Sequence, residues 1–456
     1  MQTSIAALLD ARAIRPFQLL IVALVMLALV IDGLDIQLLS LVTPVILKEW
    51  AVSRAAFGPA MAAALIGMAA GASCGGWLGD RHGRKAILVA ATFLFGIGTM
   101  AASMTHDIAT LGMLRFVSGL GFGAAAPNGV ALASEWLPRR AQSAVVGLLA
   151  VATPFGGLVG AGAVLWLLPL GGWRGCFLAC GALALLLGAA MILALPESPA
   201  YLLVKGRAAK AQRLVRRAIS GEITLAVGPS GADDRIPHQD GAPIALRDLI
   251  FAREFRRLNI GLWTGYFCVL FLAYAFSAWT PVFLTMSGFL LPQAITVSFA
   301  INLAAVTAGT GISFFIGRIG SRRPLVICCI GIVVCICAMA AALVMADRRP
   351  AASTLRILMI AGAGEGGFNG AAISIIYAML AYAYPAAGRA SGVGFGIMVG
   401  RLGGVLGALT GGALLALHGV STLPFFMVLG SLALIALLGF LIVDRHMPAS
   451  AAGAAG

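Results

Sequence analysis

Charged residues are scarce in this sequence: Asp, Glu, Lys and Arg make up 11% of its 456 residues, and only 17 residues are acidic. A soluble globular domain contains about 25% charged residues, so the shortage excludes an ordinary soluble fold. The hydrophobic content of 61% and the mean hydropathy of +1.00 are instead typical of a protein that crosses a membrane many times.

Histidine and cysteine are also few and scattered. The eight cysteines all fall in apolar segments, where they act as small packing residues, and His82, His238 and His446 fall in expected aqueous segments. No acid or histidine accompanies a cysteine at the spacing of metal ligands, and no nucleophile stands beside a base. We therefore expect no metal, no cofactor and no enzymatic activity.

Long apolar runs dominate what is present. A span needs about 18 or more apolar residues to cross a membrane, and we count twelve such runs. They are residues 17–39, 56–77, 86–104, 108–131, 142–167, 173–195, 259–285, 292–316, 324–346, 354–380, 389–416 and 422–443.

One polar insert, residues 196–257, separates the first six runs from the last six and contains eleven Lys or Arg and seven Asp or Glu. The sequence therefore predicts an all-α polytopic protein with two six-helix halves, residues 1–195 and 258–456, joined by a cytoplasmic linker. The first run has no small-residue cleavage site and is long enough to span, so it predicts an uncleaved first helix.

The basic residues indicate the orientation, because cytoplasmic loops retain Lys and Arg. With both termini inside, the cytoplasmic segments hold 23 of the 31 basic residues and the opposite side holds six. The net charge of +14 is thus mainly a topology signal, with some affinity for anionic lipid headgroups. Without a soluble basic domain, nucleic-acid binding is excluded. We expect a monomeric, multi-pass protein of the plasma or inner membrane.

Two acids lie inside the first apolar run. Asp32 and Asp35 are three residues apart, so on a helix they fall on nearly the same face and can share a proton, a cation or an arginine partner. An acid inside a membrane is costly and is a functional-site hypothesis by default. A pumped or co-transported ion is the first hypothesis.

The loop between the second and third runs, GWLGDRHGRK, resembles the signature of the major facilitator superfamily of secondary transporters. The matching positions are Gly76, Asp80, Arg81, Gly83, Arg84 and Lys85. We interpret them as a gate in which Asp80 faces a helix N-terminus and the arginines pair with acids; a simple positive-inside anchor is the alternative. A weaker copy follows the eighth run, GRIGSRRP, in which Gly317 replaces the acid.

Two arginines lie within apolar runs: Arg115 in the fourth and Arg401 in the eleventh. At 1.5 Å per residue, Asp32 lies about 22 Å and Arg401 about 20 Å from the cytoplasmic side, and Arg115 lies about 11 Å below the opposite one. The three groups are thus expected in one charged layer. A helix-end position with its charge in the interface is the alternative for Arg115.

The role of each of the other polar residues in the runs has two interpretations. Glu135 takes part in proton coupling or forms an interfacial salt bridge with Arg139 or Arg140. Glu365 is a protonated acid packed against a helix, or takes part in coupling or binding. Asn128, Asn369 and Gln37 bind a solute or join helices by hydrogen bonds.

The element Asp32-Gly33-Leu34-Asp35, the fourth run with Arg115 and Glu135, and AGRASGVGFGIMVGRLGG in the eleventh run together resemble the aromatic acid:proton symporter branch. The resemblance implies that both aspartates act in proton coupling and that Arg115 and Arg401 bind the solute. Leu34 stands where the family usually has Phe, and Gln37 and Glu365 are also unusual, which points away from a typical benzoate.

The expected function is proton-coupled uptake of an aromatic carboxylate by alternating access, driven by the proton gradient. A transporter of a sugar or organic ion, or a drug exporter by proton antiport, shares the fold-level motifs. A membrane receptor or sensor is a further alternative, but it has no need for the loop gate. The LPESPAYLLVKGR segment after the sixth run marks a helix end followed by an amphipathic cytoplasmic helix and names no substrate.

Overall fold

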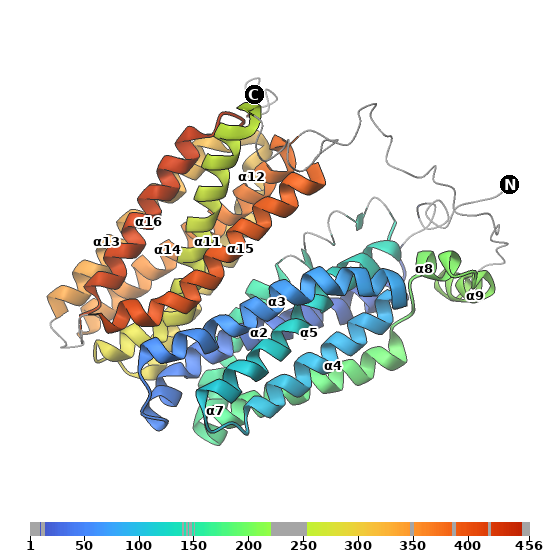
Figure 1. The fold of residues 1–456 in the computed structure, drawn as a ribbon, viewed down its shortest axis with the longest axis horizontal. Coiled ribbons are helices and arrows are strands. Elements are labelled where there is room, and N and C mark those ends of the chain that lie inside the picture. Colours follow the sequence, from blue (N-terminus) through green and yellow to red (C-terminus); the bar gives the residue numbers. More distant parts are fainter. Residues whose placement is uncertain are drawn as a thin grey trace. The chain divides into compact units, whose positions relative to one another are not determined.

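The computed structural model describes residues 10, 14–138, 141–142, 145, 148–149, 151–219, 253–346, 351–384, 389–417 and 421–448. Within these residues the regular structure is entirely helical (Figure 1). The long apolar helices are α2 (Pro16–Glu49), α3 (Arg54–His82), α4 (Arg84–Ala102), α5 (Ile108–Glu135), α7 (Ala152–Ala194), α11 (Arg256–Met286), α12 (Leu291–Ile319), α13 (Arg322–Ala346), α14 (Ala352–Ala383), α15 (Arg389–Ala416) and α16 (Leu423–Ile442).

Ten of the described helices are long and apolar enough to cross a membrane. The helix α7 covers two predicted spans, because Gly172 inside it has a left-handed backbone (φ 61°, ψ −170°) that breaks the helix into two segments. The helix α14, outside those ten, corresponds to the tenth predicted span. At the start of the fifth predicted span, residues 143–144, 146–147 and 150 lie outside the described residues.

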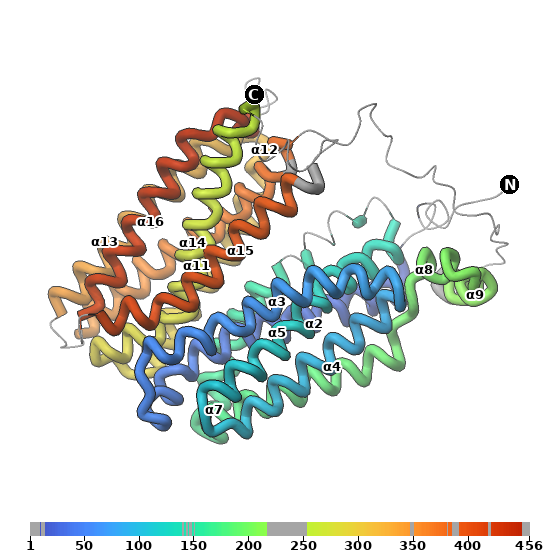
Figure 2. The backbone as a smooth tube through the Cα atoms, viewed as in Figure 1, coloured from blue at the N-terminus to red at the C-terminus, as the bar shows by residue number. Residues whose placement is uncertain are grey.

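Shorter elements follow the sixth span. The helix α8 (Pro199–Val204) is capped by Ser198, whose hydroxyl accepts a hydrogen bond from the Tyr201 amide at 3.0 Å. The helix α9 (Ala208–Ile219) comes next, and the pair lies just beyond the end of α7 (Figure 2). A 3₁₀ turn, η1 (Arg253–Phe255), precedes α11. Residues 220–252, most of the predicted linker, lie outside the described residues.

Contacts group the chain into two compact units. The first contains Met1–Ile36, Ala63–Gly160 and Leu167–His238; the second contains Gln37–Ala62, Ala161–Trp166 and Gln239–Gly456. In the second unit α11 contacts α12, α14, α15 and α16, and α13 contacts α14 and α16. The division into residues 1–195, 196–257 and 258–456 stays a prediction.

Close helix packing in the first unit depends on glycine. A Cβ atom on Gly119 of α5 would lie 2.2 Å from the Ala64 carbonyl oxygen of α3, and one on Gly123 would lie 2.1 Å from that of Met68. On the adjacent face of α5, a Cβ on Gly121 would lie 2.5 Å from the Ala91 carbonyl oxygen of α4. The three glycines thus let α5 pack closely against both neighbouring helices.

Candidate functional site

Arg115 of α5 and Asp35 of α2 form a buried ion pair. Nη1 of Arg115 lies 2.9 Å from Oδ2 of Asp35, and Nη2 lies 3.0 Å from Oδ1. Both residues are almost completely enclosed, with 1% and 3% of their surfaces exposed. This two-bond geometry is the strong form of an arginine–carboxylate contact. The interior position predicted for Arg115 is therefore correct, and the helix-end alternative is wrong.

Two hydroxyl groups complete the surroundings of this pair. Nη2 of Arg115 lies 3.0 Å from the hydroxyl oxygens of Thr99 and Ser118, and the Thr99 hydroxyl donates to Oδ1 of Asp35 at 3.1 Å. The guanidinium also stacks over the Phe177 ring at 5.1 Å, while its buried Nε has no hydrogen-bond partner. The end of the guanidinium is thus already occupied by groups of the protein itself.

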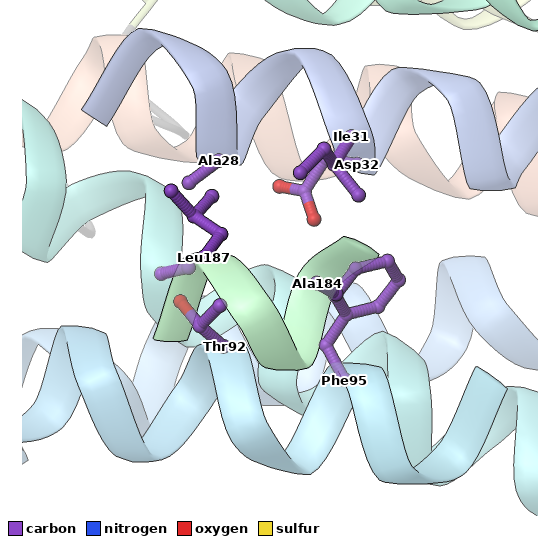
Figure 3. A pocket seen from close by; sticks show the side chains of 8 residues that line it. Ala28, Ile31, Asp32, Thr92, Phe95, Ala184 and Leu187 are labelled. Carbon is purple, nitrogen blue, oxygen red and sulfur yellow. The ribbon is translucent and has the colours of Figure 1, made fainter. Parts of the chain in front are cut away.

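Asp32 lies one helical turn before Asp35 and has a different environment. It is 2% exposed, and its buried Oδ2 atom has no hydrogen-bond partner in the part of the chain that the structure describes. Its carboxyl group faces a small hollow lined by Ala28, Ile31, Thr92, Phe95 and Leu187, among others (Figure 3). An apolar hollow of this kind cannot solvate a charge, so Asp32 is suited to hold a proton rather than to stay ionised.

Asp35 borders a second hollow, between α2, α3 and α5, whose lining includes Ala64, Met68 and Phe122. The two aspartates therefore border different hollows, and Arg115 contacts Asp35 rather than both acids. The guanidinium therefore pairs with Asp35 and is not shared between the two acids.

Arg401 lies in α15, in the second unit, and is half-buried. Gly400 and Gly404, on either side of it, let α15 pack against the rings of Tyr266 and Tyr274 of α11, since a Cβ atom there would lie 2.5 and 2.6 Å from ring atoms. Arg401 thus stands beside an aromatic surface. The charged layer that it was expected to form with Asp32 and Arg115 stays a prediction.

Glu365 and Asn369 occupy the interior of the second unit on successive turns of α14. They are 1% and 3% exposed. Nδ2 of Asn369 donates to Oε1 of Glu365 at 3.2 Å and to the Val269 carbonyl oxygen of α11 at 3.4 Å. The two residues are thus brought together as a pair, while their predicted role in binding stays a prediction.

The amide of Asn128 in α5 joins helices. Its Nδ2 atom donates to the carbonyl oxygens of Gly75 in α3 and Ala124 in α5, both at 2.8 Å. Both amide hydrogens are engaged, so the geometry favours the packing interpretation over solute binding. In the second unit, Gln37 accepts a hydrogen bond from the Ser277 hydroxyl at 2.9 Å.

The loop motif forms a polar network with the ends of α5 and α7. Arg84 forms an ion pair with Glu135, and Glu135 also accepts a hydrogen bond from the Ser198 hydroxyl. Glu197 accepts from the backbone amide of Lys85 at 3.0 Å. The salt bridge considered for Glu135 was to Arg139 or Arg140, which lie outside the described residues; the structure pairs it with Arg84 of the motif instead.

The other motif residues differ in their surroundings. Asp80 is exposed, with 73% of its side chain accessible, and lies 3.5 Å from Arg84; its contact with a helix N-terminus stays a prediction. Arg81 stacks over the Trp77 ring at 5.5 Å. Gly83 has φ 108°, and a Cβ on it would lie 2.5 Å from the Glu197 carboxylate, whereas Gly76 has open space beside it.

The weaker motif copy before α13 holds the C-terminal segment instead of a charge pair. The Ser321 amide donates to the Met447 carbonyl oxygen at 3.0 Å, and the Met447 amide donates back to the Ser321 hydroxyl at 2.9 Å. His446 lies 3.2 Å from that hydroxyl through Nδ1 and 3.1 Å from the Phe440 carbonyl oxygen through Nε2. A carbonyl only accepts, so Nε2 carries the hydrogen and Nδ1 accepts from Ser321.

The sequence reasoning missed several residues of these networks: Thr99, Ser118, Phe177, Glu197 and Ser198. A single hydroxyl in an apolar span gives little signal, although Ser118 lies one turn after Arg115 and is therefore on the same face of its helix. Glu197 and Ser198 belong to the segment recognised only as a helix end.

Comparisons with known proteins agree with this architecture. The sequence model of the Major Facilitator Superfamily matches residues 25–349 and 313–456. The chain is 32% identical to the 4-hydroxybenzoate transporter PcaK of Pseudomonas aeruginosa, over 91% of this chain and 90% of that relative. It is 29% identical to the gallate transporter of Pseudomonas putida, over 95% and 93% of the two chains.

Solved structures show the same fold at lower identity. A D-xylose-proton symporter superposes with a TM-score of 0.70 at 16% identity, covering 94% of this chain and 98% of that chain. The xylose transporter XylE from E. coli, partially occluded and inward open, gives a TM-score of 0.69 at 17% identity, covering 95% and 99%. This likeness confirms the predicted all-α polytopic fold.

Proposed function

Because the chain belongs to the Major Facilitator Superfamily, in its branch of aromatic acid transporters, we propose that it takes up an aromatic carboxylic acid together with protons by alternating access. It is a multi-pass membrane transporter and not an enzyme. We place it in the plasma or inner membrane with both termini in the cytoplasm, as the distribution of basic residues indicates.

The observation that carries the proposal is the difference between Asp32 and Asp35. Asp35 forms an ion pair with the Arg115 guanidinium and accepts a hydrogen bond from the Thr99 hydroxyl. Asp32 has a buried, unpartnered oxygen in an apolar hollow. We propose that Asp32 binds the transported proton and that Asp35 holds Arg115 in place.

Arg401 is the better candidate for binding the substrate carboxylate. It is half-buried, whereas Arg115 is 1% exposed and already paired. A guanidinium beside the half-buried Tyr274 offers both a charge for a carboxylate and a surface for an aromatic ring. Arg115 binds the anion directly only if its contacts with Asp35 are given up during the cycle.

Proton binding then couples to substrate binding through charge. A proton on Asp32 removes a negative charge from the interior, which favours entry of an anionic substrate next to Arg401. Occupancy of both sites shifts the population toward the inward-facing state, which the protein reaches when its two halves rock about the substrate. The network of Arg84, Glu135 and Ser198 belongs to one unit and holds the cytoplasmic end of that unit together.

A panel of solutes tests the substrate class. Uptake of labelled 4-hydroxybenzoate into proteoliposomes that contain the purified protein is measured. Gallate, benzoate, xylose and an organic cation are each added as unlabelled competitors. We expect the aromatic carboxylates to compete and xylose and the cation to have no effect. Competition by xylose or the cation alone would contradict the proposed substrate class.

A further inference from the structure

The pair of Glu365 and Asn369 in α14 has no role in the proposed coupling by Asp32. Glu365 lies about 20 Å along α14 from its first residue, in the middle of the helix. A carboxyl group so deep in a membrane protein is costly unless it is paired or used. Its environment therefore needs an explanation of its own.

No cation neutralises Glu365 within the part of the chain that the structure describes. Its side chain accepts a hydrogen bond from Asn369, an uncharged amide, at 3.2 Å. Cys335 of α13 is the titratable group that faces it, and the neighbouring Gly364 packs against the Cys335 sulfur. From α11 the Val269 carbonyl contributes another acceptor, and from α12 Ile301 contributes an apolar wall beside Gly366. A carboxylate in these surroundings has to carry a proton.

A second observation concerns Asn369. Its buried Oδ1 atom has no hydrogen-bond partner among the residues that the structure describes, although its Nδ2 atom makes two bonds. The pair thus contains more acceptors than donors, and a proton on Glu365 supplies one of the missing donors. Asp32 shows the same combination of an enclosed acid and an unpartnered buried oxygen.

The packing around Glu365 is also unusually close. A Cβ on Gly366 would lie 2.3 Å from the Ile301 carbonyl oxygen, and one on Gly370 would lie 2.4 Å from that of Ala305, both in α12. The two glycines thus let α14 approach the α12 backbone closely, with the Ile301 side chain beside Gly366.

We propose that Glu365, with Asn369, is a second proton-binding site of the transport cycle, in the C-terminal half and separate from Asp32. The inference rests on the proposed proton coupling. Each cycle then moves two protons with one substrate carboxylate, one on Asp32 and one on Glu365. Asn369 acts as a positioning residue that holds the carboxyl group.

The ratio of protons to substrate tests this. Wild-type protein and Glu365→Gln are reconstituted with the membrane potential clamped to zero, and the accumulation of labelled 4-hydroxybenzoate is measured at equilibrium over a range of pH gradients. Loss of one coupled proton lowers the accumulation by about tenfold at a gradient of one pH unit. Ser298→Ala, a buried polar residue of α12 bonded to its own helix, is the matched control and keeps the wild-type ratio.

Substrate exchange without a gradient separates coupling from folding. Glu365→Gln should exchange substrate at a rate near that of the wild type, and Glu365→Asp should keep the wild-type proton count. A Glu365→Gln protein with the wild-type slope of accumulation against pH gradient would overturn the inference. Equal loss of substrate exchange in Glu365→Gln and Glu365→Asp would also overturn the inference, because that result indicates a structural role for Glu365. If accumulation by the wild-type protein does not depend on the pH gradient, the proposed function is itself wrong.

Discussion

Arg115 contacts Asp35 through two nitrogen–oxygen pairs, at 2.9 and 3.0 Å. Asp32 lies one turn earlier on the same helix, and its buried Oδ2 has no hydrogen-bond partner among the described residues. Two identical side chains three residues apart therefore have opposite surroundings. One carboxylate is held charged by a guanidinium, and the other faces an apolar hollow. The predictions that follow depend on this separation.

Removing one partner of the pair should destabilise the protein strongly. In Asp35→Asn the Arg115 guanidinium stays buried without its counter-charge, which costs about 3–5 kcal/mol. Thermal unfolding of the purified protein in detergent should show a clear fall in Tm. Combining Asp35→Asn with Arg115→Gln should recover part of the loss, whereas equal losses for the single and double variants would argue against the pair. Asp107→Asn, an exposed helix cap that Asn also fills, is the control.

Asp32→Asn should separate exchange from accumulation. The amide keeps the shape of the side chain but cannot take up and release a proton, so one coupled proton is lost. Accumulation should fall by about tenfold at a gradient of one pH unit while substrate exchange continues. Accumulation of labelled substrate under a pH gradient and its exchange without a gradient are measured separately. Asp444→Asn, which changes an exposed acid outside the spans, should behave like the wild type. Gradient-driven accumulation by Asp32→Asn at the unaltered rate would remove Asp32 from the mechanism.

Gly83→Ala and Gly76→Ala should differ although both lie in the loop motif. Gly83 has a left-handed φ of 108° and no room beside the Glu197 carboxylate, so alanine there should cost about 1–3 kcal/mol. At Gly76 the added methyl group meets open space inside a helix, and stability should be unchanged or slightly higher. Thermal unfolding of the two variants checks this, and equal Tm values would show that Gly83 is not constrained.

The C-terminal segment should make stability depend on pH. Burial lowers the pKa of His446 below its ordinary value, and the nearby Arg322 acts in the same direction while Asp444 opposes it. The unfolded chain therefore binds the proton more readily than the folded one, and stability falls as the pH drops below about 6.5. We expect a lower Tm at pH 5.5 than at pH 7.5, with a smaller difference in His446→Gln. An unchanged pH dependence in that variant would place its origin elsewhere.

The helices were predictable because uninterrupted apolar runs of this length have few alternatives. The predicted run at 259–285 becomes Arg256–Met286, and the run at 292–316 becomes Leu291–Ile319. The membership of Arg115 in an interior cluster was also predictable, because an arginine inside a span needs a partner.

Which acid Arg115 selects was not predictable from spacing. Asp32 and Asp35 project from nearly the same helix face, and the choice depends on the position of α5 and on the hydroxyls of Thr99 and Ser118. The binding of the C-terminal segment by Ser321 was equally unpredictable, since it joins residues 126 positions apart through the Ser321 hydroxyl and backbone groups. Contacts of this kind depend on tertiary packing, which periodicity does not encode.

The most direct test of proton-coupled transport is accumulation of labelled 4-hydroxybenzoate in proteoliposomes with an alkaline interior and no other gradient. The account predicts that the wild-type protein concentrates the substrate inside, and that a protonophore returns the internal level to the external one. Equal internal and external concentrations in the presence of the pH gradient, with no response to the protonophore, would contradict it.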